Sequence, residues 1–339
     1  MQGTNRQLRL ARRPDGMIDD HTFDLTEEPL RDLADGEFLV RIAYLSIDPT
    51  NRVWIREEPS YLPPVGIGEV MRGGGAGEVV ESRNDAFPVG TSVLGLLGWQ
   101  EYAICGRGVM ANAVPPGVPL QHMMSVYGTT GVTAYFGILD VADPKESETV
   151  VVSGAAGATG SIAGQIAKIR GCRVIGIAGT DEKCRWLTEE LGFDAAINYK
   201  RDDIGARLDE LCPDGVDVFF DNVGGSTLDN LLRRLAIGAR IALCGAISTY
   251  NADETPPPIH WYMNLVVKRA RMQGFLVLDY LGRFPEAVLQ LVQWVSDGRI
   301  KWRDHVVEGL EQAPRALNML FTGENTGKLM VRVGPDPTA

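Results

Sequence analysis

The pattern of apolar and polar residues changes near residue 126 of this 339-residue chain. Before that point, short apolar runs such as Phe38–Val40 and Ser92–Leu97 are separated by turns rich in proline and glycine, which is typical of antiparallel β-structure. Beyond it, apolar runs of strand length alternate with amphipathic stretches, as in parallel sheets whose strands are joined by helices. The pattern predicts a β-rich domain over residues 1–125 and an α/β domain over residues 126–304.

Five apolar runs in the second half are predicted to form a doubly wound parallel sheet. They are Thr149–Ser153, Arg173–Ala178, Val216–Asp221, Ala239–Cys244 and Met272–Leu278. Helices are expected over Ser161–Ile169, where isoleucines recur on one face, and over Pro285–Asp297. A last strand, Gly327–Val333, is expected to return to the first domain, so that residues 305–339 complete it.

The first of these runs leads into a turn of small residues that opens a helix. In the segment 154–160, GAAGATG, Gly157 and Gly160 match the second and third glycines of the GxGxxG pattern, and Ala155 replaces the first. Such a turn lets the backbone approach a pyrophosphate, while the helix N-terminus supplies N–H groups and a positive dipole end. A tight turn without a ligand is the alternative, but the strands that follow favour a dinucleotide.

The residues after the second predicted strand favour NADP over NAD. An NAD-selective domain usually carries a carboxylate about 20 residues beyond the glycines, where it binds the ribose 2′-hydroxyl. Here that position is Gly179, so repulsion toward a 2′-phosphate is absent, and Lys183 is placed to meet the phosphate. A solvated surface lysine is the alternative for Lys183, and the nearby Asp181 and Glu182 oppose a bound phosphate.

Composition excludes several other functions. The 44 acidic and 33 basic side chains give a net charge of −11, which disfavours a nucleic-acid partner. No signal peptide and no long apolar stretch is evident, so we expect a cytoplasmic protein with no membrane partner. Five cysteines without a CxxC pair suit a reducing compartment. None of the four histidines lies at ligand-like spacing from a cysteine, so no metal site is predicted.

Several motifs narrow the interpretation further. They are Leu45–Arg52 (LSIDPTNR), Gly128–Gly137 (GTTGVTAYFG), Asp221–Gly225 (DNVGG), Cys244–Ser248 (CGAIS) and Gly323–Lys328 (GENTGK). With the glycine turn they resemble the medium-chain dehydrogenase/reductase superfamily, in its zinc-independent branch. That branch holds leukotriene 12-hydroxydehydrogenase/prostaglandin reductases, plant alkenal double-bond reductases and curcumin-reductase-like enzymes. The resemblance implies a GroES-like catalytic domain, a Rossmann domain and a homodimer joined through the edge strand around Met272–Leu278.

The same resemblance implies an NADPH-dependent reduction of the C=C bond in a small enone or enal substrate. A hydride would reach the β-carbon and a proton the α-carbon. It also implies a set of cofactor-binding residues. These are Gly157, Ala158, Thr159 and Gly160 at the pyrophosphate, Lys183 and Tyr199 at the 2′-phosphate, and Asn222, Cys244, Gly245, Ala246, Ile247, Ser248, Tyr250, Phe275, Leu276, Val277 and Asn325 around the ribose and nicotinamide.

The chain departs from relatives at three positions. Zinc-dependent cousins carry Gly-His-Glu where this chain has Gly68-Glu69-Val70, so the histidine ligand is missing. Several relatives have a tyrosine, proposed to stabilise the enolate, where this chain has Val267, and an aromatic residue where it has Thr50.

Enolate stabilisation is therefore assigned to Tyr61 or Tyr262, or to the ribose hydroxyl and water. An amphipathic tyrosine at a domain seam is the alternative for both tyrosines. Two other functions stay open, a quinone oxidoreductase of the same superfamily and a nucleotide-binding sensor that has lost its chemistry.

Overall fold

The chain divides into two compact units in the computed structural model, which describes residues 3–58, 60–106, 111–251 and 258–338. The first unit comprises residues 1–124, 304–325 and 329–339, and the second comprises residues 125–303 and 326–328. Within the described ranges, no helix is both long and apolar enough to cross a membrane.

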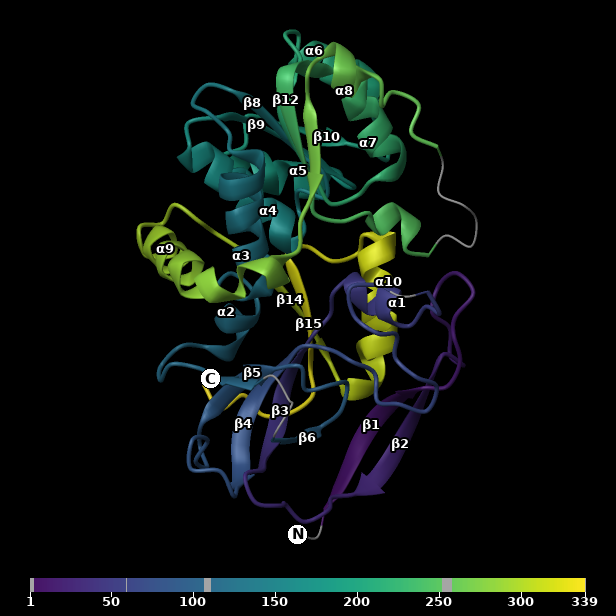
Figure 1. Cartoon of the computed structure of the whole chain (residues 1–339), viewed down its shortest axis with the longest axis vertical. Coiled ribbons are helices and arrows are strands. Elements are labelled where there is room, and N and C mark those ends of the chain that lie inside the picture. The colour runs from purple at the N-terminus through teal and green to yellow at the C-terminus, as the bar shows by residue number, and fades with distance from the viewer. Residues whose placement is uncertain (1–2, 59, 107–110, 252–257, 339) are drawn as a thin grey trace. The chain divides into compact units, whose positions relative to one another are not determined.

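A six-stranded parallel sheet forms the centre of the second unit, in the order β10-β9-β8-β11-β12-β13 (Figure 1). The strands are β8 (Thr149–Val152), β9 (Arg173–Ala178), β10 (Ala195–Asn198), β11 (Val216–Asp221), β12 (Leu235–Leu243) and β13 (Arg271–Gly274). Counted along the chain, this is the order 3-2-1-4-5-6 of a dinucleotide-binding Rossmann sheet. The predicted doubly wound sheet is therefore confirmed.

Two details of the sequence prediction were wrong. The strand β10 was missed because its four residues, Ala-Ala-Ile-Asn, include one large apolar side chain. The run Met272–Leu278 leaves the sheet at Gly274, and a 3₁₀-helix, η4 (Val277–Arg283), follows it.

Helices cover both faces of this sheet, which explains why its strands are almost continuously apolar. Val150 and Val152 pack in one cluster with α3 and α4, whereas Val151 points into the opposite cluster with α6 and α7. The helical elements of this unit are α3 (Thr129–Phe136), η1 (Gly137–Ala142), α4 (Ala158–Ile169), α5 (Asp181–Arg185), η2 (Trp186–Glu190), α6 (Ile204–Leu211), α7 (Gly225–Leu232), η3 (Ile247–Thr249), α8 (Asn264–Val267), η4 and α9 (Phe284–Ser296).

The first unit is rich in antiparallel strands. Its strands are β1 (Thr4–Leu10), β2 (Phe23–Pro29), β3 (Phe38–Ser46), β4 (Gly75–Ser82), β5 (Ser92–Gly95), β6 (Tyr102–Cys105), β7 (Ala111–Ala113), β14 (Asp304–Glu308) and β15 (Lys328–Arg332). Its helical elements are α1 (Thr50–Trp54), α2 (Leu120–Met124), η5 (Leu310–Gln312) and α10 (Ala313–Thr322). A seven-stranded sheet holds all the strands except β1 and β2, and β15 pairs antiparallel with β3.

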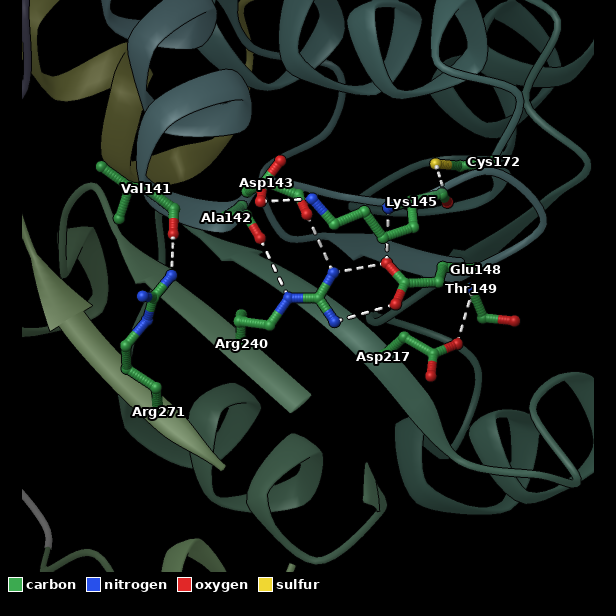
Figure 2. A network of polar contacts seen from close by, with 10 residues as sticks. All are labelled: Val141, Ala142, Asp143, Lys145, Glu148, Thr149, Cys172, Asp217, Arg240 and Arg271. Atoms are coloured by element: carbon green, nitrogen blue, oxygen red, sulfur yellow. Dashed lines mark hydrogen bonds and ion pairs between the residues drawn. The ribbon is translucent and has the colours of Figure 1, made fainter. Parts of the chain in front are cut away.

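A polar network ties the second unit together at the amino ends of its central strands (Figure 2). The Arg240 guanidinium donates to Glu148 Oε1 at 2.9 Å, to the carbonyl of Ala142 at 3.1 Å and to that of Asp143 at 3.0 Å. A second guanidinium nitrogen pairs with the other Glu148 oxygen. Burial by itself would raise the pKa of Glu148, but the hydrogen bonds from Arg240 and the Lys145 backbone bring that pKa below its usual value.

Arg240→Met is expected to lower the free energy of unfolding by about 2 kcal/mol, because it leaves the partly buried Glu148 carboxylate without its cation. The deficit should shrink as the pH falls through the lowered pKa of Glu148, since the wild type then loses the pair as well. Denaturant unfolding measures both effects. Arg240→Met combined with Glu148→Met serves as the control and should recover part of the loss. Strictly additive losses would contradict this account.

Candidate functional site

The carboxyl ends of the parallel strands gather most of the predicted cofactor residues at one edge of the second unit's sheet. Because the strands run parallel, the segments that follow β8, β9, β10, β11, β12 and β13 all start from the same edge. The strand order reverses between β8 and β11, and ligands of open α/β sheets bind outside the carboxyl ends at such a point. The segments that follow β8 and β11 therefore lie where a cofactor is expected.

The glycine turn after β8 shows a distinct role for each glycine. Gly154 adopts a φ of +57° and makes the sharp turn, so the left-handed residue is Gly154 and the alanine at position 155 needs no special conformation. A Cβ added to Gly160 would strike the carbonyl oxygen of Gly154 and lie 3.0 Å from Cα of Ala155, so this glycine is required for close helix–strand packing.

Gly157 differs from these two glycines because the surrounding protein would hinder a side chain at this position less. A Cβ added there would meet one atom, the Gly154 carbonyl oxygen at 3.2 Å. The residue precedes the first turn of α4, where Ala158 and Thr159 begin the helix. This open backbone at the start of a 12-residue helix fits a pyrophosphate, which accepts N–H hydrogen bonds there.

A segment far along the chain, around Gly327, hydrogen-bonds to this turn. The backbone N–H of Gly327 donates to the Ala156 carbonyl at 2.8 Å, and Gly327 forms a parallel bridge with Gly157. Gly327 has a φ of +70°, and a Cβ on it would strike the carbonyl of Arg303. Gly327 thus braces the glycine turn. Asn325, two residues earlier, is buried and is counted with the first unit.

A cationic corner lies where β9 and β10 end side by side, with Ala178 opposite Asn198. Lys183 lies in α5, which Thr180 caps by accepting the Lys183 N–H at 3.2 Å. Burial lowers the pKa of the Lys183 ammonium, and the positive charge of Lys200 lowers it further. Two cations are thus held near each other, an arrangement that a bound phosphate dianion would stabilise.

Tyr199 lies against the position where an NAD-type carboxylate would stand. A Cβ added to Gly179 would lie 3.0 Å from both Cε1 and Oη of Tyr199. An aspartate or glutamate at position 179 would therefore have to displace the half-exposed Tyr199 ring. The predicted 2′-phosphate residues Lys183 and Tyr199 are brought together at this corner, and sequence reasoning missed Lys200 as a third member.

A buried carboxylate organises the loop after β11. Asp221 Oδ1 accepts hydrogen bonds from Ser153 Oγ at 2.7 Å, from the Val223 N–H at 2.9 Å and from the Gly224 N–H at 3.1 Å. Burial raises the pKa of Asp221 above its usual value, and these hydrogen bonds act in the opposite direction. Ser153 Oγ also accepts the Asn222 N–H at 2.8 Å, so one network joins the ends of β8 and β11. Neither Ser153 nor Asp221 was predicted as a site residue, although Asp221 opens the DNVGG motif.

The loop after β12 docks on the Asp221–Gly225 loop. The Ile247 N–H donates to the Asn222 carbonyl at 3.2 Å, and Ser248 Oγ donates to the Val223 carbonyl at 2.6 Å. Tyr250 Oη accepts the Ala246 N–H at 3.0 Å and closes the loop on itself. The predicted residues Asn222, Cys244, Gly245, Ala246, Ile247, Ser248 and Tyr250 are therefore held in one connected structure.

The Cys244 thiol is unsuited to nucleophilic attack. Enclosure by protein atoms, with a smaller contribution from the charge of Asp221, raises its pKa to about 12. A thiol with such a pKa stays protonated at neutral pH, and the thiolate is the nucleophilic form. This agrees with the interpretation of Cys244 as part of the wall.

Close packing against a π-helical turn fixes the start of the segment Phe275–Val277. A Cβ added to Gly137, in η1, would strike the Phe275 ring and lie 2.6 Å from Cε2 of Phe220. The rings of Phe136 and Tyr280 stack with centroids 4.3 Å apart and hold η4 to α3. Phe275, Leu276 and Val277 thus follow β13 on a rigid support, and π-helical turns are frequent at functional sites.

The two candidate tyrosines differ in their surroundings. In the first unit, Tyr61 Oη hydrogen-bonds to Thr50 Oγ1, and Trp54 lies edge-on to its ring at 6.4 Å. Burial raises the pKa of Tyr61, although the hydrogen bond to Thr50 counteracts this, so the phenol keeps its proton at neutral pH. Tyr262 belongs to the second unit and is 57% exposed just before α8. Val267, at the position of the family tyrosine, is 61% exposed.

No metal centre is found in the part of the chain that the structure describes. Among these residues, no three histidine, cysteine or acidic side chains lie close enough to hold a metal ion. Glu69, in the Gly68-Glu69-Val70 segment, caps a turn by accepting the Gly66 N–H at 2.8 Å.

Comparison with known proteins shows the family to which this chain belongs. Residues 6–113 match the family model described as the N-terminal domain of oxidoreductase, and residues 158–294 match the model described as zinc-binding dehydrogenase. The NADPH-dependent curcumin reductase of Escherichia coli is 42% identical over 98% of both chains. The chain belongs to the zinc-independent enone-reductase branch of the medium-chain dehydrogenase/reductase superfamily.

Other members of this family support the same placement. Prostaglandin reductase 1 of Rattus norvegicus is 40% identical over 94% of this chain and 96% of its own. The crystal structure of CurA from Vibrio vulnificus in complex with NADPH has a TM-score of 0.92 and 43% identity, covering 97% of this chain and 99% of that one. The predicted fold class, a GroES-like β-rich domain plus a Rossmann domain, is therefore confirmed.

Proposed function

We propose that this protein uses NADPH to reduce the C=C bond of α,β-unsaturated ketones and aldehydes. The curcumin, prostaglandin and CurA relatives suggest both the cofactor and a carbonyl-conjugated substrate. The observation that carries the proposal is the corner beyond the glycine turn, where Lys183, Tyr199 and Lys200 converge and Gly179 stands in place of a carboxylate. That corner favours a 2′-phosphate over a 2′-hydroxyl.

Each segment at the carboxyl edge of the parallel sheet is assigned one task. When bound, NADPH supplies a hydride for the substrate's β-carbon. Gly157 to Gly160 bind the pyrophosphate, and the loop that carries Asn222 orients the ribose. The Phe275–Val277 segment and the Cys244–Ser248 loop would form the wall around the nicotinamide. As the hydride arrives, the substrate oxygen gains negative charge, and a proton must reach the α-carbon.

Tyr61 is the residue that we assign to the developing enolate. Its phenol keeps its proton and shares a hydrogen bond with Thr50 in which either hydroxyl can be the donor, so the Tyr61 O–H can donate to an enolate oxygen. Tyr61→Phe is expected to slow single-turnover hydride transfer by about 10- to 100-fold. Stopped-flow absorbance of NADPH measures this rate. Tyr262→Phe is the matched variant and should change the rate less than about twofold. If hydride transfer slowed only in Tyr262→Phe, the stabilisation of the enolate would belong to Tyr262 and not to Tyr61.

Steady-state NADPH oxidation against enals, enones and quinones of graded length tests the reaction class. We expect kcat/KM for simple enones to exceed that for quinones by at least about tenfold. A preference for quinones would favour the alternative oxidoreductase. NADPH binding without turnover of any substrate would indicate a sensor.

We further propose that the protein forms a homodimer in the cytoplasm. The strand β13 lies at the edge of its sheet, and exposed apolar side chains flank it at Val266, Val267, Leu276 and Leu278. An edge strand of this kind pairs readily with its copy across a two-fold axis. The five free thiols suit a reducing compartment. Light scattering at micromolar concentration should give twice the chain mass, and a monomer would contradict the dimer.

A further inference from the structure

Three carboxylates surround the corner that is proposed to bind the 2′-phosphate. Asp181 and Glu182 begin α5, and Asp202 follows the turn that carries Tyr199 and Lys200. An unpaired carboxylate near a phosphate dianion would weaken NADPH binding. The structure shows how two of these three charges are balanced.

Arg201 pairs with two of these carboxylates at once. Its Nη1 lies 2.8 Å from Asp181 Oδ1 and 2.9 Å from Asp181 Oδ2, and its Nε donates to Asp202 Oδ1 at 3.0 Å. The hydrogen bond from Arg201 holds the pKa of Asp202 below its usual value. One guanidinium thus neutralises charge on both sides of the corner.

Asn198 also holds Asp181 and Asp202 in place. This residue is 7% exposed at the end of β10, and its Nδ2 donates to Asp181 Oδ1 at 2.8 Å. Its Oδ1 accepts the Lys200 N–H at 3.1 Å, so the amide links Asp181 to the turn that presents the second lysine. Asp202 Oδ2 accepts the Asn198 N–H at 3.1 Å. The acidic side chains are thus held by the turn at 198–202.

We propose that Arg201 is a positioning residue for cofactor selectivity, which keeps Asp181 and Asp202 from repelling the 2′-phosphate that Lys183 and Lys200 attract. The inference rests on the proposed use of NADPH. It explains how a corner with three acidic residues serves a dianionic ligand. The residue acts through its ion pairs, with no direct contact to the phosphate.

The test is a double-mutant cycle read by direct binding. The Kd values for NADPH and for NADH are measured by fluorescence titration on the full-length wild type, Arg201→Met, Asp181→Asn and the double variant. Arg201→Met should raise the Kd for NADPH about five- to tenfold and that for NADH less than about twofold. The double variant should recover about half of the lost NADPH affinity, because the uncovered Asp181 carboxylate is gone while Asp202 still lacks its partner. The effect should weaken as salt is added.

Lys168→Met provides the matched control. It also removes one cation of an ion pair, with Asp194 at 2.8 Å, but it lies at the C-terminal end of α4, at the opposite edge of the sheet. It should leave the ratio of the two Kd values unchanged. Because the Arg201 and Asp181 side chains are 64% and 52% exposed, the variants should keep the wild-type melting curve.

Two results would overturn the role of Arg201. One is an unchanged ratio of Kd values in Arg201→Met, and the other is a double variant that stays as weak as Arg201→Met, which would mean direct contact with the phosphate. The failure of the proposed function is separate. A wild type that prefers NADPH but turns over no enone would overturn the reaction and leave the inference standing. A wild type with equal Kd values for NADPH and NADH would overturn both.

Discussion

Lys183→Met is expected to raise the Kd for NADPH by about 30- to 100-fold and to change the Kd for NADH less than about twofold. The lysine lies at the corner with Lys200, and its proposed role is to meet the 2′-phosphate, a group that only NADPH carries. A charge-assisted contact contributes about 1.5–3 kcal/mol, or about 12- to 150-fold in Kd, and the predicted range lies within these limits. Fluorescence titration with both nucleotides measures the effect.

The pH dependence of binding adds a second observable for Lys183. Because burial and Lys200 lower its pKa, this ammonium loses its proton at a lower pH than an ordinary lysine. The Kd for NADPH should therefore rise on the alkaline side before that for NADH does, and Lys183→Met should remove this rise. Lys168→Met again serves as the control. An equal loss of affinity for both nucleotides in Lys183→Met would contradict the assignment.

Asp221→Ala is expected to lower the free energy of unfolding by about 2–4 kcal/mol and to weaken NADPH and NADH binding to the same extent. The substitution leaves the Ser153 hydroxyl and the N–H groups of Val223 and Gly224 without their acceptor. Since the same loop carries Asn222, its loosening disturbs a part of the site that both nucleotides share. Chemical denaturation and paired titrations measure the two effects.

Asp221→Asn gives the matched comparison. Its amide oxygen accepts the hydrogen bonds that meet at Oδ1, so its losses should be about half those of alanine or smaller. Ser153→Ala should fall between the wild type and Asp221→Ala, because the Val223 and Gly224 contacts survive. An Asp221→Ala variant with wild-type stability would contradict the organising role of this carboxylate.

The sequence predicted the Rossmann sheet because burial on both faces makes its strands apolar, and this leaves a clear pattern. The short strand β10 lacked that pattern, and its last residue Asn198 was missed with it, as was Arg201 in the turn that follows. The turn was predicted from its glycines, but the residue that adopts a positive φ is Gly154, one position before the expected match.

The contacts of the cationic corner depend on the fold. In the sequence the acidic Asp181 and Glu182 stand beside the basic Lys183. The charges of these three residues alone therefore do not predict whether this segment attracts or repels a phosphate. Arg201 lies 20 positions beyond Asp181 along the chain, and only the pairing of β9 with β10 brings the two together. The absence of a carboxylate at Gly179 is evident in the sequence, whereas the contact between this position and the Tyr199 ring depends on the fold.

The central claim is that this protein transfers a hydride from NADPH to the β-carbon of a conjugated carbonyl compound. The most direct test combines the wild type with a simple enone and NADPH deuterated at the transferred position, followed by mass spectrometry and NMR of the product. We predict one equivalent of saturated ketone per NADPH, with the carbonyl intact and deuterium on the β-carbon. An allylic alcohol, deuterium at the carbonyl carbon, or no product at all would contradict this account.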